Sequence, residues 1–178
     1  MRDKSWIALG LCGLTIALLG QPERASAGGM FGSDANACTS GRGPAILVNV
    51  LGLKDRQGQV KLELYPDNPD DFMRSDTDLL TAGKVFRRVT VATPETGAVS
   101  LCIKVPHPGR YALLMLHSRR AQDKFDVFAD GVGLRSNARI GRARPSVDAA
   151  TVAVGSGIVS LDIHTQYLHG LGGFSPMR

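Results

Sequence analysis

The sequence predicts an all-β fold, a single antiparallel β-sandwich of about seven strands (transthyretin-like or Ig-like) with one short helix in a loop. Short runs of β-branched and apolar residues recur along the chain, and several alternate apolar with polar side chains. Turns that contain Gly, Pro or Asp separate these runs at a spacing typical of two packed sheets. The chain has 178 residues, which suits one domain.

The first 27 residues are predicted to be a cleaved signal peptide. Arg2 and Lys4 give a positive start, and an uncharged, mostly apolar run of about 14 residues follows over 6–19. Ala25-Ser26-Ala27 provides the small-x-small pattern before a cleavage site at Gly28. The alternative, a membrane anchor, needs roughly 20 apolar residues. We therefore expect export, with no transmembrane anchor after cleavage.

The exported part is predicted to consist of an arm, a sandwich and a tail. Residues 28–44 are rich in Gly, Ser, Ala and Asn and are expected to form an irregular arm. The sandwich is assigned to residues 45–168, and the Gly-rich segment 169–178 is expected to be a flexible tail. In chain order, strands are predicted over residues 45–51, 60–65, 84–91, 98–105, 111–116, 151–154 and 158–168.

Four segments carry the clearest local signals. Residues 60–65 and 158–168 alternate apolar with polar side chains, as expected of strands with one buried face. Residues 111–116 are the most apolar and are predicted to form the central strand. Asn68-Pro69-Asp70-Asp71 has the composition of a helix start, because Asn caps, Pro fits the first turn and acids favour the positive helix end. We expect one short helix between this segment and Gly83.

Cys38 and Cys102 are predicted to form a disulfide. The third cysteine, Cys12, is lost with the signal peptide, so the remaining pair has only one connectivity. An oxidising compartment favours a bridge that ties the arm to a mid-domain strand. The alternative is two unpaired cysteines, one in the arm and one buried. Redox catalysis is not indicated, because the chain contains no Cys-x-x-Cys motif.

A series of motifs links this chain to known proteins. In order, it comprises Pro108-Gly109-Arg110-Tyr111-Ala112, His117, Lys124-Phe125-Asp126, Gly131, Gly133, Ser136-Asn137-Ala138, Pro145-Ser146-Val147, Ala150 and Val152. This pattern resembles a bacterial family of exported proteins called domain of unknown function 2141, and weaker correspondence extends over 45–168. The resemblance implies a transthyretin-like or immunoglobulin-like sandwich in the periplasm or outside the cell. It implies no established activity.

The loop after His117 departs from that family. The family usually continues as His-Asp-x-Asn-x-Asn-Gly, whose oxygens suit a hard cation, whereas here two arginines follow in Ser118-Arg119-Arg120-Ala121-Gln122. His117 together with Asp123, Asp126 and Asp130 is the remaining candidate for a loop site. Calcium requires six to eight oxygen ligands, so we expect solvated acids here, and neither a metal nor a cofactor.

The histidines and one tyrosine are expected to be structural. His107, His117, His164 and His169 are scattered, whereas zinc needs three or four convergent ligands. His117 ends the central strand and is predicted to fix the following loop by a hydrogen bond. Tyr111 stands where a sandwich corner places a tyrosine whose hydroxyl bonds back to nearby backbone. No catalytic residue is assigned, because the chain has neither a Gly-x-Ser-x-Gly elbow nor the C-terminal Tyr-Arg-Gly-Ser of transthyretin-fold ureide hydrolases.

Four arginines form the main basic cluster: Arg135, Arg139, Arg142 and Arg144. Guanidinium groups bind phosphate and carboxylate well, so the cluster is a candidate contact for a polyanion. The alternative is a solvated loop. Residues 134–144 contain no aromatic side chain for stacking on bases. Nucleic acid is therefore not expected as a partner.

These observations favour an exported, non-catalytic binding or accessory module of the cell envelope. Variable polar loops on a rigid sandwich are a common place for recognition. Its expected partner is an unidentified envelope protein or an anionic envelope component. One alternative is a small periplasmic hydrolase or metal-dependent protein that uses His117 and the loop from Asp123 to Asp130. The other is a structural envelope protein.

Overall fold

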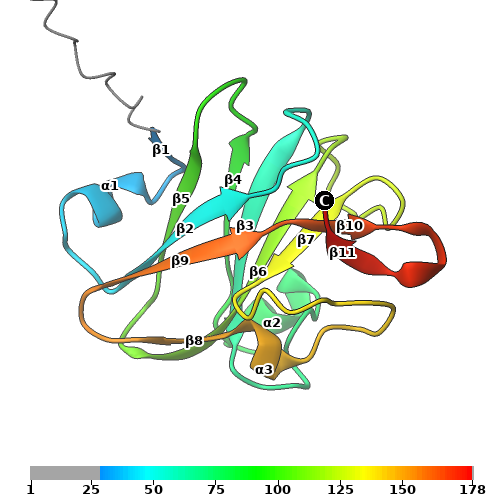
Figure 1. The fold of residues 1–178 in the computed structure, drawn as a ribbon. Coiled ribbons are helices and arrows are strands. Elements are labelled where there is room, and N and C mark those ends of the chain that lie inside the picture. Colours follow the sequence, from blue (N-terminus) through cyan, green and yellow to red (C-terminus); the bar gives the residue numbers. More distant parts are fainter. Residues whose placement is uncertain (1–28, 178) are drawn as a thin grey trace, which may run out of the picture.

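Two β-sheets pack face to face in this protein (Figure 1). The computed structural model describes residues 29–177. The predicted signal peptide, residues 1–27, lies outside the described residues. The all-β sandwich predicted from the sequence is confirmed.

Six of the seven predicted strands are present with small shifts at the ends, and the seventh, over 158–168, is divided into two. The strands are β1 (Met30–Phe31), β2 (Ala45–Leu51), β3 (Gln59–Pro66), β4 (Arg87–Ala92), β5 (Val99–Lys104), β6 (Gly109–Ser118), β7 (Gly131–Leu134), β8 (Thr151–Val154), β9 (Ile158–His164), β10 (Gln166–Leu168) and β11 (Phe174–Pro176). The helices are α1 (Ala35–Thr39), α2 (Asp76–Thr81), α3 (Val147–Ala150) and the 3-10 turn η1 (Gly170–Gly172).

The smaller sheet has the strand order β1-β5-β2-β9, and the larger one has the order β11-β10-β7-β6-β3-β4, with β8 also paired to β6. Most neighbouring strands are antiparallel, as predicted. Two pairs, β2 with β9 and β1 with β5, run parallel. The first arises because the chain leaves β8 in the larger sheet, turns at residues 155–157 and enters the smaller sheet alongside β2 (Figure 1).

The main core lies between the two sheets. Alternation along each strand directs every second side chain inward, and these side chains are apolar. The fully buried members include Ile46, Val48, Leu62, Leu64, Leu101, Ile103, Leu113, Met115 and Ile163. Each contributes about 1.5–3 kcal/mol by leaving water, which makes this layer the main source of stability.

The chain changes sheets at Thr165. The single strand predicted over 158–168 is therefore two strands, β9 in the smaller sheet and β10 in the larger one. The crossing passes directly over β7. A Cβ atom at Gly131 would lie 2.5 Å from Thr165 Cγ2, and one at Gly133 would lie 2.5 Å from Ile163 Cγ2. Only glycine leaves room for this approach.

The predicted helix begins later than expected. Asn68 starts a single turn, in which its carbonyl accepts from the Phe72 N–H at 3.0 Å, but Met73 adopts a positive φ of 60° and ends it. The helix α2 follows instead from Ser75, whose Oγ accepts from the Asp78 N–H. The helix is therefore capped by Ser75 and not, as the sequence predicts, by Asn68.

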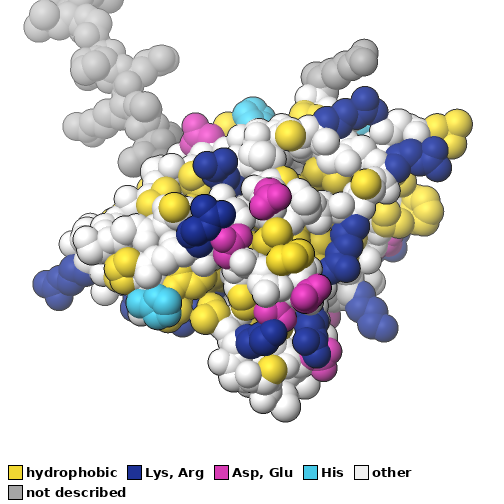
Figure 2. Space-filling view, turned by 90° about the horizontal axis from the view of Figure 1, so that it is seen from below, with side chains coloured by type: hydrophobic (Ala, Val, Ile, Leu, Met, Phe, Trp, Pro, Cys, Tyr) yellow, Lys and Arg dark blue, Asp and Glu magenta, His cyan; other side chains and the backbone are white. Residues whose placement is uncertain are grey.

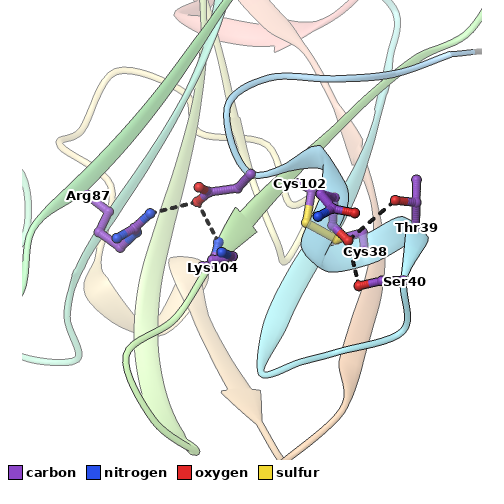
Figure 3. The surroundings of a disulfide bond; sticks show 8 residues. Cys38, Thr39, Ser40, Arg87, Cys102 and Lys104 are labelled. Atoms are coloured by element: carbon purple, nitrogen blue, oxygen red, sulfur yellow. Dashed lines mark hydrogen bonds and ion pairs between the residues drawn. A yellow bond between two sulfur atoms is a disulfide. The ribbon is translucent and has the colours of Figure 1, made fainter.

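The arm, predicted to be irregular, contains β1 and α1 and is fastened to the smaller sheet and, through Arg87, to β4 of the larger sheet. The predicted disulfide joins Cys38 to Cys102, with the Cα atoms 6.0 Å apart. Beside it, the buried carboxylate of Asp34 accepts from Arg87 Nη2 at 2.8 Å and from the Lys104 N–H at 2.9 Å (Figure 3). A disulfide and an ion pair thus attach the same short segment of the arm to the sandwich.

The tail, residues 169–178, which is predicted to be flexible, contains a short strand. Residues Phe174–Pro176 form β11, which pairs with β10 and extends the larger sheet. Arg139 Nη2 donates to the Gly172 carbonyl at 2.6 Å. Backbone pairing therefore joins this Gly-rich segment to the larger sheet.

The outer edge of β9 is occupied by one side chain. Asn137 has a left-handed φ of 53°. Its Nδ2 donates to the Asp162 carbonyl at 2.7 Å, and its Oδ1 accepts from the His164 N–H at 2.8 Å. The amide thus makes the two hydrogen bonds that a neighbouring strand would make at this place.

Replacing both Cys38 and Cys102 with Ala is expected to lower the free energy of unfolding by about 4 kcal/mol, because the bridge closes a long loop in the unfolded chain. Urea denaturation measures this loss. Wild-type protein in reductant is the control and should lose a similar amount. Equal stability of the oxidised wild type and the double variant would contradict the prediction.

Candidate functional site

A groove of about 570 Å³ lies on the outer face of the larger sheet. Leu113 and Met115 of β6 face the core, so alternation turns Leu114 and Leu116 toward the groove. Val132 of β7 continues this floor. The volume falls within the roughly 300–1,000 Å³ typical of small-molecule sites.

Three segments that are distant in sequence form the walls. They are residues 123–127, residues 140–145 and the tail residues 168–174. Gly141 and Phe174 exchange two backbone hydrogen bonds, of 3.0 and 2.7 Å, which join the second wall to the third. The rings of Phe125 and Phe174 lie 6.0 Å apart, so the first wall contacts the third. The walls therefore support one another.

Exposed apolar side chains form part of the rim of the groove. Eight large apolar side chains are exposed in the described part of the chain, and half of them line this groove: Met73, Phe125, Val127 and Leu171. Leu171 is 87% exposed and Phe125 is 43% exposed. Figure 2 shows exposed hydrophobic side chains next to Lys and Arg side chains on one side of the molecule. Such a concentration is typical of an interaction site.

A buried polar network borders the floor. Glu63 accepts from Arg88 Nε and from the Tyr65 hydroxyl, both at 2.7 Å. Arg88 also donates to Asp76 at 2.9 Å. Burial, and then the negative charge of Glu63, raise the pKa of Tyr65 far above its ordinary value, so its hydroxyl remains a donor. The Glu63 carboxylate is thus already paired.

The structure divides the predicted arginine cluster. Arg142 and Arg144 line the groove and are exposed, which places them at its opening. Arg144 Nη2 donates to the Phe72 carbonyl at 2.6 Å. Arg139 instead holds the tail, and Arg135 is exposed outside the groove lining. Two of the four predicted contact residues therefore share one site.

His117 is fully buried between the sheets and does not reach the groove. Its Nε2 lies 2.8 Å from the Gln57 carbonyl, which can only accept, so Nε2 carries the proton. Its Nδ1 then accepts from the Tyr167 hydroxyl at 2.6 Å, and that hydroxyl accepts from the Lys54 N–H at 2.9 Å. Burial lowers the pKa of His117 and raises that of Tyr167 to about 12. The imidazole thus joins the loop between β2 and β3 to strand β10. The prediction that it fixes the loop after His117 is wrong, because both ring nitrogens bond elsewhere.

The three predicted loop acids do not converge. Asp130, 2% exposed, accepts from the backbone N–H groups of Arg119 and Asp126, both at 2.9 Å. Asp126 accepts from Arg120 at 2.7 Å, whereas Asp123 is exposed and lines the groove. Within residues 29–177, no three His, Cys, Asp or Glu side chains are grouped so that they could share a metal ion.

The remaining histidines are exposed, and one adjoins the sandwich corner. The Tyr111 hydroxyl donates to the His107 carbonyl at 2.7 Å, which is the predicted corner hydrogen bond. His107, His164 and His169 are exposed and belong to different segments. They do not contribute to the groove.

Sequence reasoning missed the groove itself. Lys61, Glu63 and Tyr65 looked like the solvent face of β3, yet all three are buried. A usable signal was present, because residues 111–116 are apolar on both faces of their strand. A strand with two apolar faces must be covered on both sides.

Comparisons with known proteins add one family. A family model described as "Uncharacterized protein conserved in bacteria (DUF2141)" matches residues 48–161, which is more than half of the chain. The match includes the floor of the groove and two of its walls, and ends before the tail wall. No curated protein and no solved structure matched. None of the helices described for residues 29–177 has the length and apolar character to cross a bilayer.

The wild-type free energy of unfolding should fall as the pH drops from 7.5 to 5.5. The unfolded histidine binds a proton near pH 6.5, while the buried imidazole, with its lowered pKa, resists protonation. The contribution of His117 to the free energy of unfolding is therefore fully present above pH 6.5 and decreases as the pH falls below it. Urea denaturation at both pH values measures this change.

His117→Gln should flatten that pH dependence, whereas His164→Gln, on the exposed face of β9, should retain it. A slope that is unchanged in His117→Gln would show that another group is responsible.

Proposed function

We propose that this chain, which belongs to the bacterial family DUF2141, is an exported binding module of the cell envelope that holds an apolar ligand in the groove on its larger sheet. One observation carries the proposal. The groove combines a suitable volume with an apolar floor, and it gathers half of the exposed large apolar side chains of the described residues.

The composition of the groove favours binding over catalysis. Among the described residues that line it there is no Ser, Thr, Cys, His or Lys. These residue types supply most catalytic nucleophiles and many general bases. Asp123 also lines the groove, but its carboxylate is exposed to solvent. The one buried carboxylate, Glu63, is engaged by Arg88 and Tyr65.

Two features support the assignment to the envelope. The N-terminal pattern before Gly28 is that of a cleaved signal peptide. The Cys38–Cys102 bridge is the type of bond that persists in oxidising compartments. A member of a bacterial family with both features fits the periplasm or the outside of the cell.

Filling the groove should abolish binding of a neutral apolar probe. Ala143 lines the groove, so Ala143→Trp places an indole within it. Wild-type protein should enhance and blue-shift the fluorescence of N-phenyl-1-naphthylamine. The variant should bind it about tenfold more weakly or worse, a loss of roughly 1.4 kcal/mol or more.

The matched control is Ala153→Trp, at an exposed position of β8 outside the groove. It should bind the probe like wild type, and thermal melting should show both variants folded. Equal binding by Ala143→Trp and wild type would place the probe elsewhere and reject the groove as the site.

A further inference from the structure

We infer that the ligand is a single-chain amphiphile with an anionic head, whose chain lies on the apolar floor and whose head is bound by Arg142 and Arg144. This inference rests on the proposed function, because it names the class of ligand for the same groove. It follows from the absence of hydrogen-bonding side chains on the floor, from the charges at the opening and from the volume of the groove.

The floor can hold only an apolar group. Leu114, Leu116 and Val132 offer no side-chain hydrogen bond. Among the polar side chains that line the groove, those of Tyr65 and Arg88 are already bonded to Glu63. A polar group placed here would lose its hydrogen bonds to water without replacement. The buried part of the ligand must therefore be a chain or ring without polar atoms.

The charges that line the groove leave an excess of positive charge at its opening. Glu63 and Arg88 form an ion pair of 2.7 Å and compensate each other. Arg142 makes no hydrogen bond or ion pair with any of the residues described, and Arg144 uses one N–H on the Phe72 carbonyl. Asp123 is the one acid that opposes them among the lining residues.

The two guanidinium groups and the floor lie in the same groove. Guanidinium groups bind carboxylate and phosphate through paired N–H donors. A ligand that uses both the floor and the arginines must be apolar at one end and anionic at the other. The volume of about 570 Å³ suits a small molecule and thus one chain.

The test compares cis-parinaric acid, a fluorescent fatty acid, with its uncharged methyl ester. Wild-type protein should bind the acid more tightly than the ester, and added NaCl should weaken only the acid. Arg142→Gln should weaken binding of the acid by up to about fivefold and leave binding of the ester unchanged. Asp123→Asn should strengthen binding of the acid, because it removes the opposing charge.

The matched control is Arg135→Gln, since Arg135 is exposed and lies outside the groove lining. It should bind both probes like wild type. Competition with palmitic acid and with a lysophosphatidic acid then separates a carboxylate head from a phosphate head. Displacement of the acid probe by either supports the inference, and displacement by neither overturns it.

The two proposals fail in different ways. If the acid, the ester and N-phenyl-1-naphthylamine all fail to bind, the groove is not a binding site and both proposals are wrong. If the neutral probes bind but the acid has no advantage and Arg142→Gln has no effect, the proposed function stands and the anionic head is rejected. Association with phosphatidylglycerol vesicles without displacement of the acid probe would also overturn the inference.

Discussion

The absence of side chains at two positions of β7 allows the chain to cross from one sheet to the other. Gly131 and Gly133 let residues 163–167 pass within van der Waals distance of the β7 backbone. That crossing brings Tyr167 against His117 and delivers β10 to the larger sheet. The groove depends on it too, because β10 leads into the tail that forms one of its walls.

The larger sheet is unusual in being buried over much of both faces. Its inner face packs on the smaller sheet, while its outer face is covered at one end by the segment containing α2. Between this cover and the tail the apolar surface stays open and forms the groove. The polar groups of the outer face are paired among themselves, as Glu63, Tyr65 and Arg88 show. This pairing leaves the exposed arginines as the main charges at the opening.

Patterns that act over a few residues were enough to predict most of the strands, the disulfide and the corner hydrogen bond of Tyr111. Alternation and turn residues are local, and a single pair of cysteines leaves one connectivity. The groove could not be predicted in this way, because its walls come from segments that meet only after the sheet crossing. The strand β7 was missed because Gly131-Val132-Gly133-Leu134 has little β propensity; long-range packing places it in the sheet.

Asn137 has a consequence for how copies of this protein meet. An open strand edge is a template for pairing with another chain, and repeated pairing leads to fibres. The Asn137 amide occupies the donor and acceptor positions of β9 that an incoming strand would need. Addition at this edge would first have to displace that side chain and its left-handed backbone. One amide thus acts against polymerisation, a task for which many sandwiches use bulges or charged edge residues.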